Sequence, residues 1–178
     1  QLLMLPRTVV KLSLGAEDAL EAFRLALSEQ PDHFDGLESL SLSSNDHDGP
    51  GKLLFDGNLP RGLQQLDLDM PRQLPKHHDP TLSLLCEPRI VLTTLPSTLT
   101  TLSIRATSLD DLKGHKLPST LTDLAAYIAK SEIDYMAILP SGLLSCRFNI
   151  DKAIMSPSDW QWDLLPPGIT ELGISGRP

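Results

Sequence analysis

The sequence predicts an α/β fold built from stacked repeats, with short parallel strands on one side and irregular or short helical segments on the other. A ten-residue string, Leu95 to Ile104, recurs 22 residues later from Leu117 and again 22 residues after that from Leu139. The shared template is L-P-x-x-L-x-x-L-x-L. Its x-L-x-L part alternates polar and apolar residues, as in a strand with one buried face. Self-similarity at a fixed period of this length is typical of repeat architectures.

The template accounts for seven strands, one in each repeat. The leucine at its fifth position, or an aliphatic substitute, stands at Val9, Leu37, Leu63, Leu99, Leu121, Leu143 and Ile169. A strand with a single apolar face is not stable alone, but stacking the next repeat buries that face. We therefore expect the strands to lie side by side in chain order, joined by segments that return on the opposite side.

Two connecting segments have features of their own. Leu20, Phe23 and Leu27 recur at helical spacing before Pro31, which predicts a helix over residues 16–29. Four prolines interrupt residues 70–92, inside the 36-residue spacing that is too long for one repeat. We interpret residues 70–92 as a long loop or a degenerate repeat. The whole chain 1–178 is then a single array with one irregular insertion.

The Leu-Pro pair that opens most repeats has a structural reason. Proline cannot continue a helix and donates no backbone hydrogen bond, so it ends the returning segment before the next strand. In Pro60-Arg61-Gly62 and its equivalents we expect a turn with proline at the second position and glycine at the fourth.

The segment from Leu37 to Asn45 completes the nine-residue motif LxxLxLxxN. On this motif the chain resembles a leucine-rich repeat protein. Its Leu-Pro lead is similar to the short repeats of bacterial effectors that enter host cells and to the Leu-Pro repeats of amoebal and related eukaryotic proteins. The resemblance implies a solenoid with strands on its concave side. The asparagine of the motif occurs only as Asn45, its equivalents being Pro71, Thr107, Ala129 and Asp151, so we expect a less regular ladder between repeats.

Composition disfavours two classes of partner. The net charge is −8, and a surface of that sign repels nucleic-acid phosphates and anionic lipid head groups. No apolar run is long enough to cross a bilayer. Two cysteines without a CxxC pair favour a reducing compartment, so we expect a cytoplasmic location. Because the repeat pattern begins at once, we interpret the chain as a fragment that self-associates or is poorly stable alone.

Few residues indicate a catalytic or metal-binding site. Cys146 occupies a template leucine position, so we expect a buried, unreactive thiol. His77-His78-Asp79 lacks a second ligand pair and reads as a solvated loop. Trp160 and Trp162 are expected to pack under the last returning segment. No phosphate-binding loop, nucleophile elbow or paired carboxylates occur. The sequence thus predicts neither a cofactor, nor a metal, nor enzymatic activity.

The polar positions between the template leucines remain as a binding surface. Solenoids bind partners on the extended face formed by their strands. The candidate residues are those with charged or aromatic side chains: Asp67, Asp69, Arg105, Asp123, Tyr127 and Arg147. We expect a non-enzymatic module that binds a protein partner on this concave face. The alternative is the substrate-recognition arm of a larger enzyme, such as a ubiquitin ligase, with its catalytic part outside this chain.

Overall fold

A computed structural model describes most of the repeated segments. The described residues are 2–15, 17–43, 53–55, 59–69, 90–92, 95–108, 117–128, 139–151 and 162–177. Only the backbone is described for residues 17, 53–55, 90–92, 105–108, 127–128, 150–151, 162 and 176–177.

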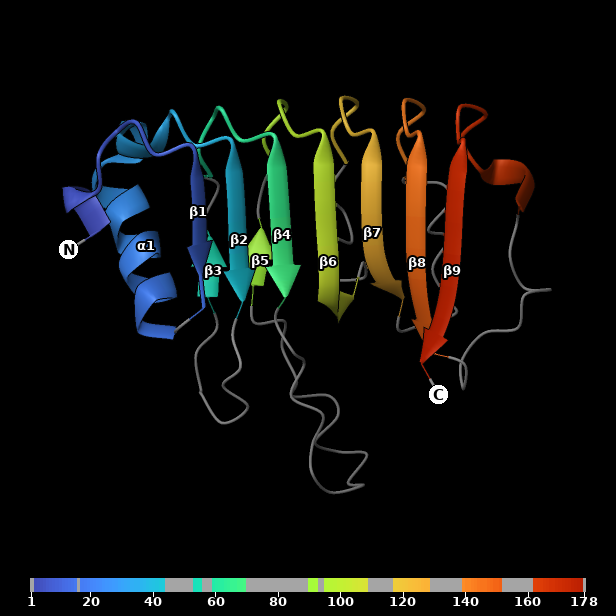
Figure 1. Cartoon of the computed structure of the whole chain (residues 1–178), viewed down its shortest axis with the longest axis horizontal. Coiled ribbons are helices and arrows are strands. Elements are labelled where there is room, and N and C mark those ends of the chain that lie inside the picture. Colours follow the sequence, from blue (N-terminus) through green and yellow to red (C-terminus); the bar gives the residue numbers. More distant parts are fainter. Residues whose placement is uncertain are drawn as a thin grey trace, which may run out of the picture.

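Within these residues, seven strands form one parallel sheet in chain order (Figure 1). They are β1 (Lys11–Leu14), β2 (Ser39–Ser43), β4 (Gln65–Asp69), β6 (Thr101–Ser108), β7 (Asp123–Ile128), β8 (Ser145–Asp151) and β9 (Glu171–Arg177). Each strand begins with the x-L-x-L part of one repeat, and over that part the register places equivalent template positions opposite one another, as in Leu40 opposite Leu66. The expected α/β class, its strands and their parallel order are confirmed.

The remaining described elements are few. They are the helix α1 (Glu17–Glu29), the 3-10 helices η1 (Leu2–Met4), η2 (Pro31–Phe34) and η7 (Trp162–Leu164), and the short strands β3 (Leu53–Phe55) and β5 (Ile90–Leu92). The helix predicted over residues 16–29 is confirmed as α1. The parallel β3–β5 pair was not predicted, because neither tripeptide matches the template.

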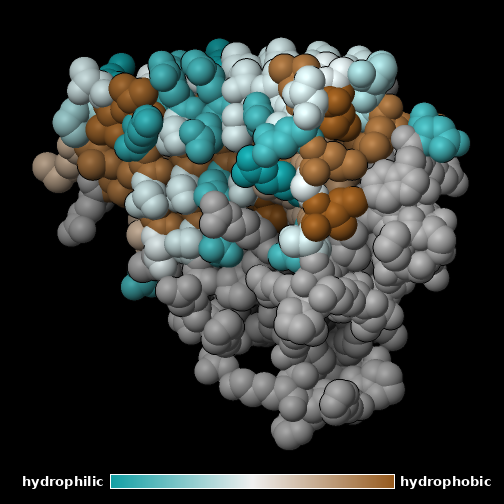
Figure 2. All heavy atoms as spheres, turned by 45° about the vertical axis from the view of Figure 1, so that its right-hand side comes forward, coloured by the Kyte–Doolittle hydropathy of each residue, from teal (hydrophilic) through white to brown (hydrophobic). Residues whose placement is uncertain are grey.

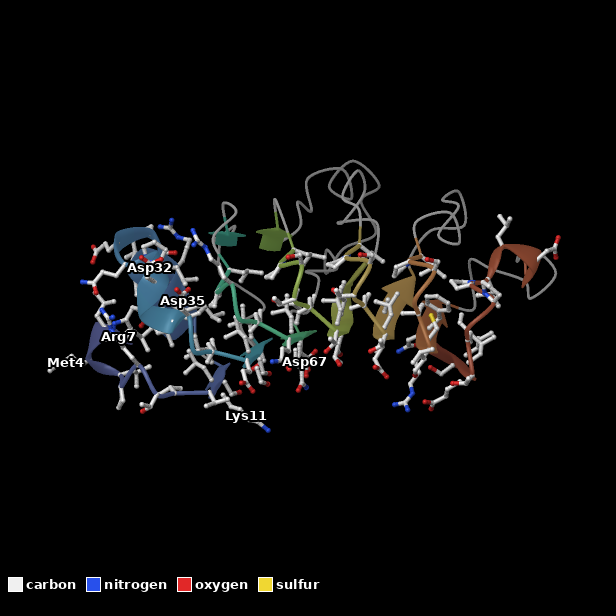
Figure 3. All side chains as sticks on the ribbon, turned by 90° about the horizontal axis from the view of Figure 1, so that it is seen from above. Met4, Arg7, Lys11, Asp32, Asp35 and Asp67 are labelled. Atoms are coloured by element: carbon white, nitrogen blue, oxygen red, sulfur yellow. The ribbon has the colours of Figure 1, made fainter. Side chains whose placement is uncertain are left out.

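These elements leave one side of the sheet open. Seen from above, α1, β3 and β5 lie on one side of the seven strands, whereas the side chains of Lys11 and Asp67 point to the other (Figure 3). We call the side of Lys11 and Asp67 the open face. The helix α1 contacts η1, η2 and β3.

The segment 70–92 falls largely outside the described residues. Its last three residues form β5, which pairs with β3. In the main sheet, β4 pairs directly with β6, from Gln65 opposite Thr101 to Leu68 opposite Ile104. The long interval between these two repeats therefore adds no strand between them.

Layers of buried aliphatic side chains, mostly leucines, make the core. The leucines at the fifth template position of the five central repeats, from Leu37 to Leu143, are fully buried. The strand leucines Leu40, Leu66 and Leu102 are fully buried as well. Full burial of each such side chain stabilises the fold by roughly 1.5–3 kcal/mol. At the β1 end, the rings of Phe23 and Phe34 meet edge to face with centroids 5.1 Å apart, which joins α1 to η2.

The turn before each strand differs by one residue from the expected one. The N–H of Leu63 donates to the carbonyl of Pro60 at 3.1 Å, and the same bond recurs at each Leu-Pro repeat. Proline is therefore first in the turn and glycine third, and the expected second and fourth positions are wrong. The shift places Pro167 at the second position of its turn, where its fixed φ angle is favourable.

A ladder of backbone hydrogen bonds joins consecutive repeats at the start of the strands. The carbonyl oxygen of Gln64 accepts the N–H groups of both Thr100 and Thr101, at 2.8 and 3.0 Å, and the Thr100 hydroxyl adds a third donor at 3.2 Å. Equivalent pairs of backbone hydrogen bonds are accepted by the carbonyl oxygens of Val10, Glu38, Thr100, Thr122 and Leu144. At this end of the strands the ladder is regular.

The ladder is irregular at one of the two described positions where the motif asparagine is missing, whereas at the other, Asp151, the register continues opposite Arg177. Between β6 and β7 the register shifts after Ile104, so that Ser108 stands opposite Tyr127. The shift includes Thr107, one of the residues in the asparagine position. Asn45 itself, together with Pro71 and Ala129, lies outside the described residues.

Candidate protein-binding face

The open face is formed by polar residues that alternate with the buried leucines. The register aligns them in rows across the strands. The row nearest the turns contains Lys11, Ser39, Gln65, Thr101, Asp123, Ser145 and Glu171. The central row contains Ser13, Ser41, Asp67, Ser103, Ala125, Arg147 and Gly173. Most of these side chains are small, so the face offers many hydroxyl groups and few bulky ones.

Two of the predicted residues stand together on β4. Asp67 is half-buried in the central row, in register with Ser41 and Ser103, and its Oδ1 atom is buried. Asp69 is exposed two residues further along the strand, opposite Ser43. The two carboxylates make β4 the acidic strand of the open face.

Asp123 lies on the same face, two strands away from β4. Its side chain is exposed, and its Oδ2 atom accepts a hydrogen bond from the Thr122 hydroxyl at 2.7 Å. The register places it between Thr101 and Ser145. Asp123 therefore extends the acidic character from β4 towards β7.

Arg147 pairs with a residue that was not among the predicted six. Its Nη2 atom lies 2.6 Å from Oε1 of Glu171 on β9, and the Ser145 hydroxyl donates to the other carboxylate oxygen at 3.0 Å. The hydrogen bond from Arg147 is the main cause that lowers the pKa of Glu171 below its ordinary value, followed by the bond from Ser145. Both charged side chains are more than half exposed, so this pair positions Arg147 but adds little stability.

Small neighbours give the Arg147 side chain its space. Ala125 and Gly173 flank it in the central row. A Cβ atom added at Gly173 would lie 3.2 Å from Cγ of Arg147. The partner Glu171 could have been found in the sequence, since it stands at the polar template position that precedes Gly173 by two residues.

Arg105 and Tyr127 are not neighbours in the register. Both residues directly follow the x-L-x-L part of their repeat, so an unbroken register would set them opposite each other. The shift after Ile104 instead sets Ser108 opposite Tyr127 on one side, while Asn149 lies opposite it on the other. The side chains of Arg105 and Tyr127 lie outside the described part of the chain.

The other groups considered in the sequence add no second site in the described part of the chain. Cys146 is fully buried on β8, and burial raises the pKa of its thiol to about 12. No group of three or more potential metal ligands occurs among the described residues. Cys86, His77, His78, Asp79 and Trp160 lie outside them, and Trp162 is described only by its backbone in η7. None of the helices that the structure describes is both long and apolar enough to cross a membrane.

Comparison of the chain with protein-family models, with curated proteins and with solved structures gave no match.

Proposed function

We propose that this chain is a leucine-rich-repeat solenoid and that its open face binds a protein partner. The observation that carries the proposal is that no described element covers the open face. Seven strands present aligned polar residues there, whereas α1, β3 and β5 all lie on the other side. Solenoids use such extended sheet faces for recognition.

The charges of the open face favour a partner with basic groups. Asp67, Asp69 and Asp123 lie on β4 and β7, whereas the described cations of this face lie nearer the two ends of the sheet, Lys11 on β1 and Arg147 on β8, where Arg147 pairs with Glu171. The net charge of −8 has the same sign. Complementary charges raise the rate and the specificity of association more than the affinity. The partner we propose therefore presents lysine or arginine side chains opposite β4 to β7, with hydrogen-bonding groups over the serine-rich strand β2.

Affinity enrichment from cells that express the chain, using matched charge variants, tests this proposal. Asp69→Lys/Asp123→Lys reverses two exposed charges on the open face. Glu29→Lys/Asp32→Lys makes the same change in charge at the end of α1 and in η2, on the other side of the sheet, where Asp32 lies (Figure 3). We expect a protein that the wild type captures to be lost by the open-face variant and kept by the control. Equal capture by both variants would refute the proposed face.

The alternative assignment, the recognition arm of a larger enzyme, uses the same face. It differs in the fate of the captured protein, which would then be modified by a catalytic domain outside this chain. A captured partner that carries ubiquitin only when the full-length protein is present would favour it. An unmodified, stably bound partner favours the interaction module.

A further inference from the structure

Arg147 lies between two carboxylates on the open face. In the row nearest the turns, Ser145 stands opposite Asp123 on β7 and opposite Glu171 on β9. Arg147 follows two residues after Ser145 on β8, and so lies on the same face. Adjacent strands are about 4.8 Å apart and two residues span about 6.6 Å, so the Cα atoms of both acidic residues lie about 8 Å from that of Arg147. The register therefore sets two carboxylates within reach of this cation.

Two features on the β9 side hold Arg147 against Glu171. A Cβ atom added at Gly173 would lie 3.2 Å from Cγ of Arg147, so the glycine leaves room for the arginine stem over β9. The Nη2 atom of Arg147 then reaches Oε1 of Glu171 at 2.6 Å. The Ser145 hydroxyl donates to the other carboxylate oxygen at 3.0 Å and fixes its orientation.

The β7 side is the less favourable alternative. Ala125 has a Cβ atom at the register position where Gly173 has none. Aspartate is one methylene shorter than glutamate, and the Thr122 hydroxyl already donates to Oδ2 of Asp123 at 2.7 Å. Figure 2 brings the β9 end forward and shows hydrophilic side chains beside apolar ones at its surface. Because both side chains of the observed ion pair are more than half exposed, a small free energy decides which carboxylate Arg147 contacts.

We infer that Glu171 is a positioning residue, which holds Arg147 away from Asp123 and leaves the negative charge of Asp123 uncompensated. An arginine paired with Asp123 would neutralise that carboxylate and repel an approaching lysine or arginine. This role rests on the proposed function, in which Asp123 contacts basic groups of a partner. Glu171 and Gly173 then determine specificity without lying on the acidic strand β4.

Gly173→Ala tests the position of Arg147 without changing any charge. The added Cβ atom would crowd Cγ of Arg147 and displace the side chain towards β7. We expect the pKa of Glu171 to rise towards its ordinary value in a carbon-detected NMR titration, although Arg147 is still present. Gly168→Ala is the matched control, because its Cβ atom would meet only ordinary contacts, the nearest at 3.6 Å. It should leave the pKa of Glu171 unchanged.

A synthetic pentalysine peptide reports which carboxylate is uncompensated. The probe is added at low salt, and the shift changes of the backbone amides are followed by NMR. In the wild type we expect the larger change at Asp123 and the smaller at Glu171, and in Gly173→Ala the reverse order. In Gly173→Ala/Arg147→Gln both residues should respond, because the cation is gone.

Two results would overturn the positioning role. One is a pKa of Glu171 that stays low in Gly173→Ala. The other is an undiminished pentalysine response at Asp123 in that variant, which would mean that the arginine had moved into solvent. Neither result bears on the proposed function, which fails separately if Asp69→Lys/Asp123→Lys captures the partner as the wild type does.

Glu171→Gln covers the case in which Gly173→Ala prevents folding. Glu171 is 55% exposed, so its replacement leaves the core unchanged. A crystal structure of this variant should show a guanidinium nitrogen of Arg147 about 2.8 Å from a carboxylate oxygen of Asp123. An arginine that stays over β9 or points into solvent would overturn the inference.

Discussion

The hydroxyl of Thr120 lies 2.7 Å from the carbonyl oxygen of Ser97, the residue that precedes the equivalent threonine one repeat earlier. The same hydroxyl lies 2.8 Å from the carbonyl of Leu99. Thr98 makes the same two contacts with Arg61 and Leu63. In these two repeats the threonine at the fourth template position thus ties its turn to the turn before it.

Removal of the threonine bridge should destabilise the fold. Thr120→Val keeps the shape of the side chain but removes the one hydroxyl proton that the two carbonyls share, and we expect a loss of about 1–2 kcal/mol in the free energy of unfolding. Urea denaturation measures it. Ser119→Ala, at the exposed neighbouring position, should change the value by less than about 0.5 kcal/mol. Equal free energies of unfolding for the two variants would show that the bridge does not stabilise the fold.

Glycine at the same template position should be required where the turns come closest. A Cβ atom added at Gly62 would lie 2.5 Å from the backbone oxygen of Asp35, so we expect Gly62→Ala to cost roughly 1–3 kcal/mol. At Gly168 the nearest atom would be 3.6 Å away, an ordinary contact, and Gly168→Ala should be tolerated. Thermal unfolding of the two variants compares them directly. The account is wrong if Gly168→Ala is the more destabilised.

The ion pair on the open face should be visible in the titration of Glu171. Because Arg147 lowers the pKa of Glu171, Arg147→Gln should raise it towards its ordinary value. The pKa of Glu21, which Arg24 lowers on α1, should not move. Carbon-detected NMR titration of the two carboxyl groups gives both values.

The sign of the effect on stability follows from the depressed pKa. A carboxyl group whose pKa is lower in the folded state adds stability above its unfolded pKa, and this contribution is lost as the pH falls through the folded value. Since both side chains are exposed, we expect this acid-dependent loss to be small for the wild type. It should be smaller still for Arg147→Gln. A larger acid sensitivity in the variant would contradict the assignment.

The thiol of Cys146 should be inert while the protein is folded. The side chain is fully buried, and its pKa of about 12 leaves almost no thiolate at neutral pH. In a Cys86→Ser background, we expect an aromatic disulfide reagent to react only when denaturant unfolds the chain. Rapid reaction of the native protein would show that β8 opens or that the thiol is accessible.

The sequence predicted the strands well because leucine burial imposes a period that is independent of local propensity. The positions from Leu37 to Leu143 that open each strand motif are the fully buried row, and α1 was evident from Leu20, Phe23 and Leu27. The β3–β5 pair escaped prediction, because two tripeptides without periodicity cannot be identified as strands.

The open face was less accessible to prediction. Arg105 and Tyr127 stand at the same place in their repeats, yet they are not opposite each other, because a register shift is a property of the paired backbones and not of either sequence alone. The pairing of Arg147 with Glu171 required knowledge that Gly173 and Ala125 leave room for the arginine side chain. Residues that carry the core follow from periodicity, whereas contacts between polar residues depend on the geometry of neighbouring repeats.

The most direct test of the central claim is the dissociation constant of the captured partner for three forms of the chain. These are the wild type, Asp69→Lys/Asp123→Lys and Glu29→Lys/Asp32→Lys, measured by titration calorimetry at one salt concentration. We predict that the open-face variant binds at least about tenfold more weakly, a difference of roughly 1.4 kcal/mol, while the control binds as the wild type does. Wild-type affinity in the open-face variant, or an equal loss in both variants, would contradict recognition by the open face.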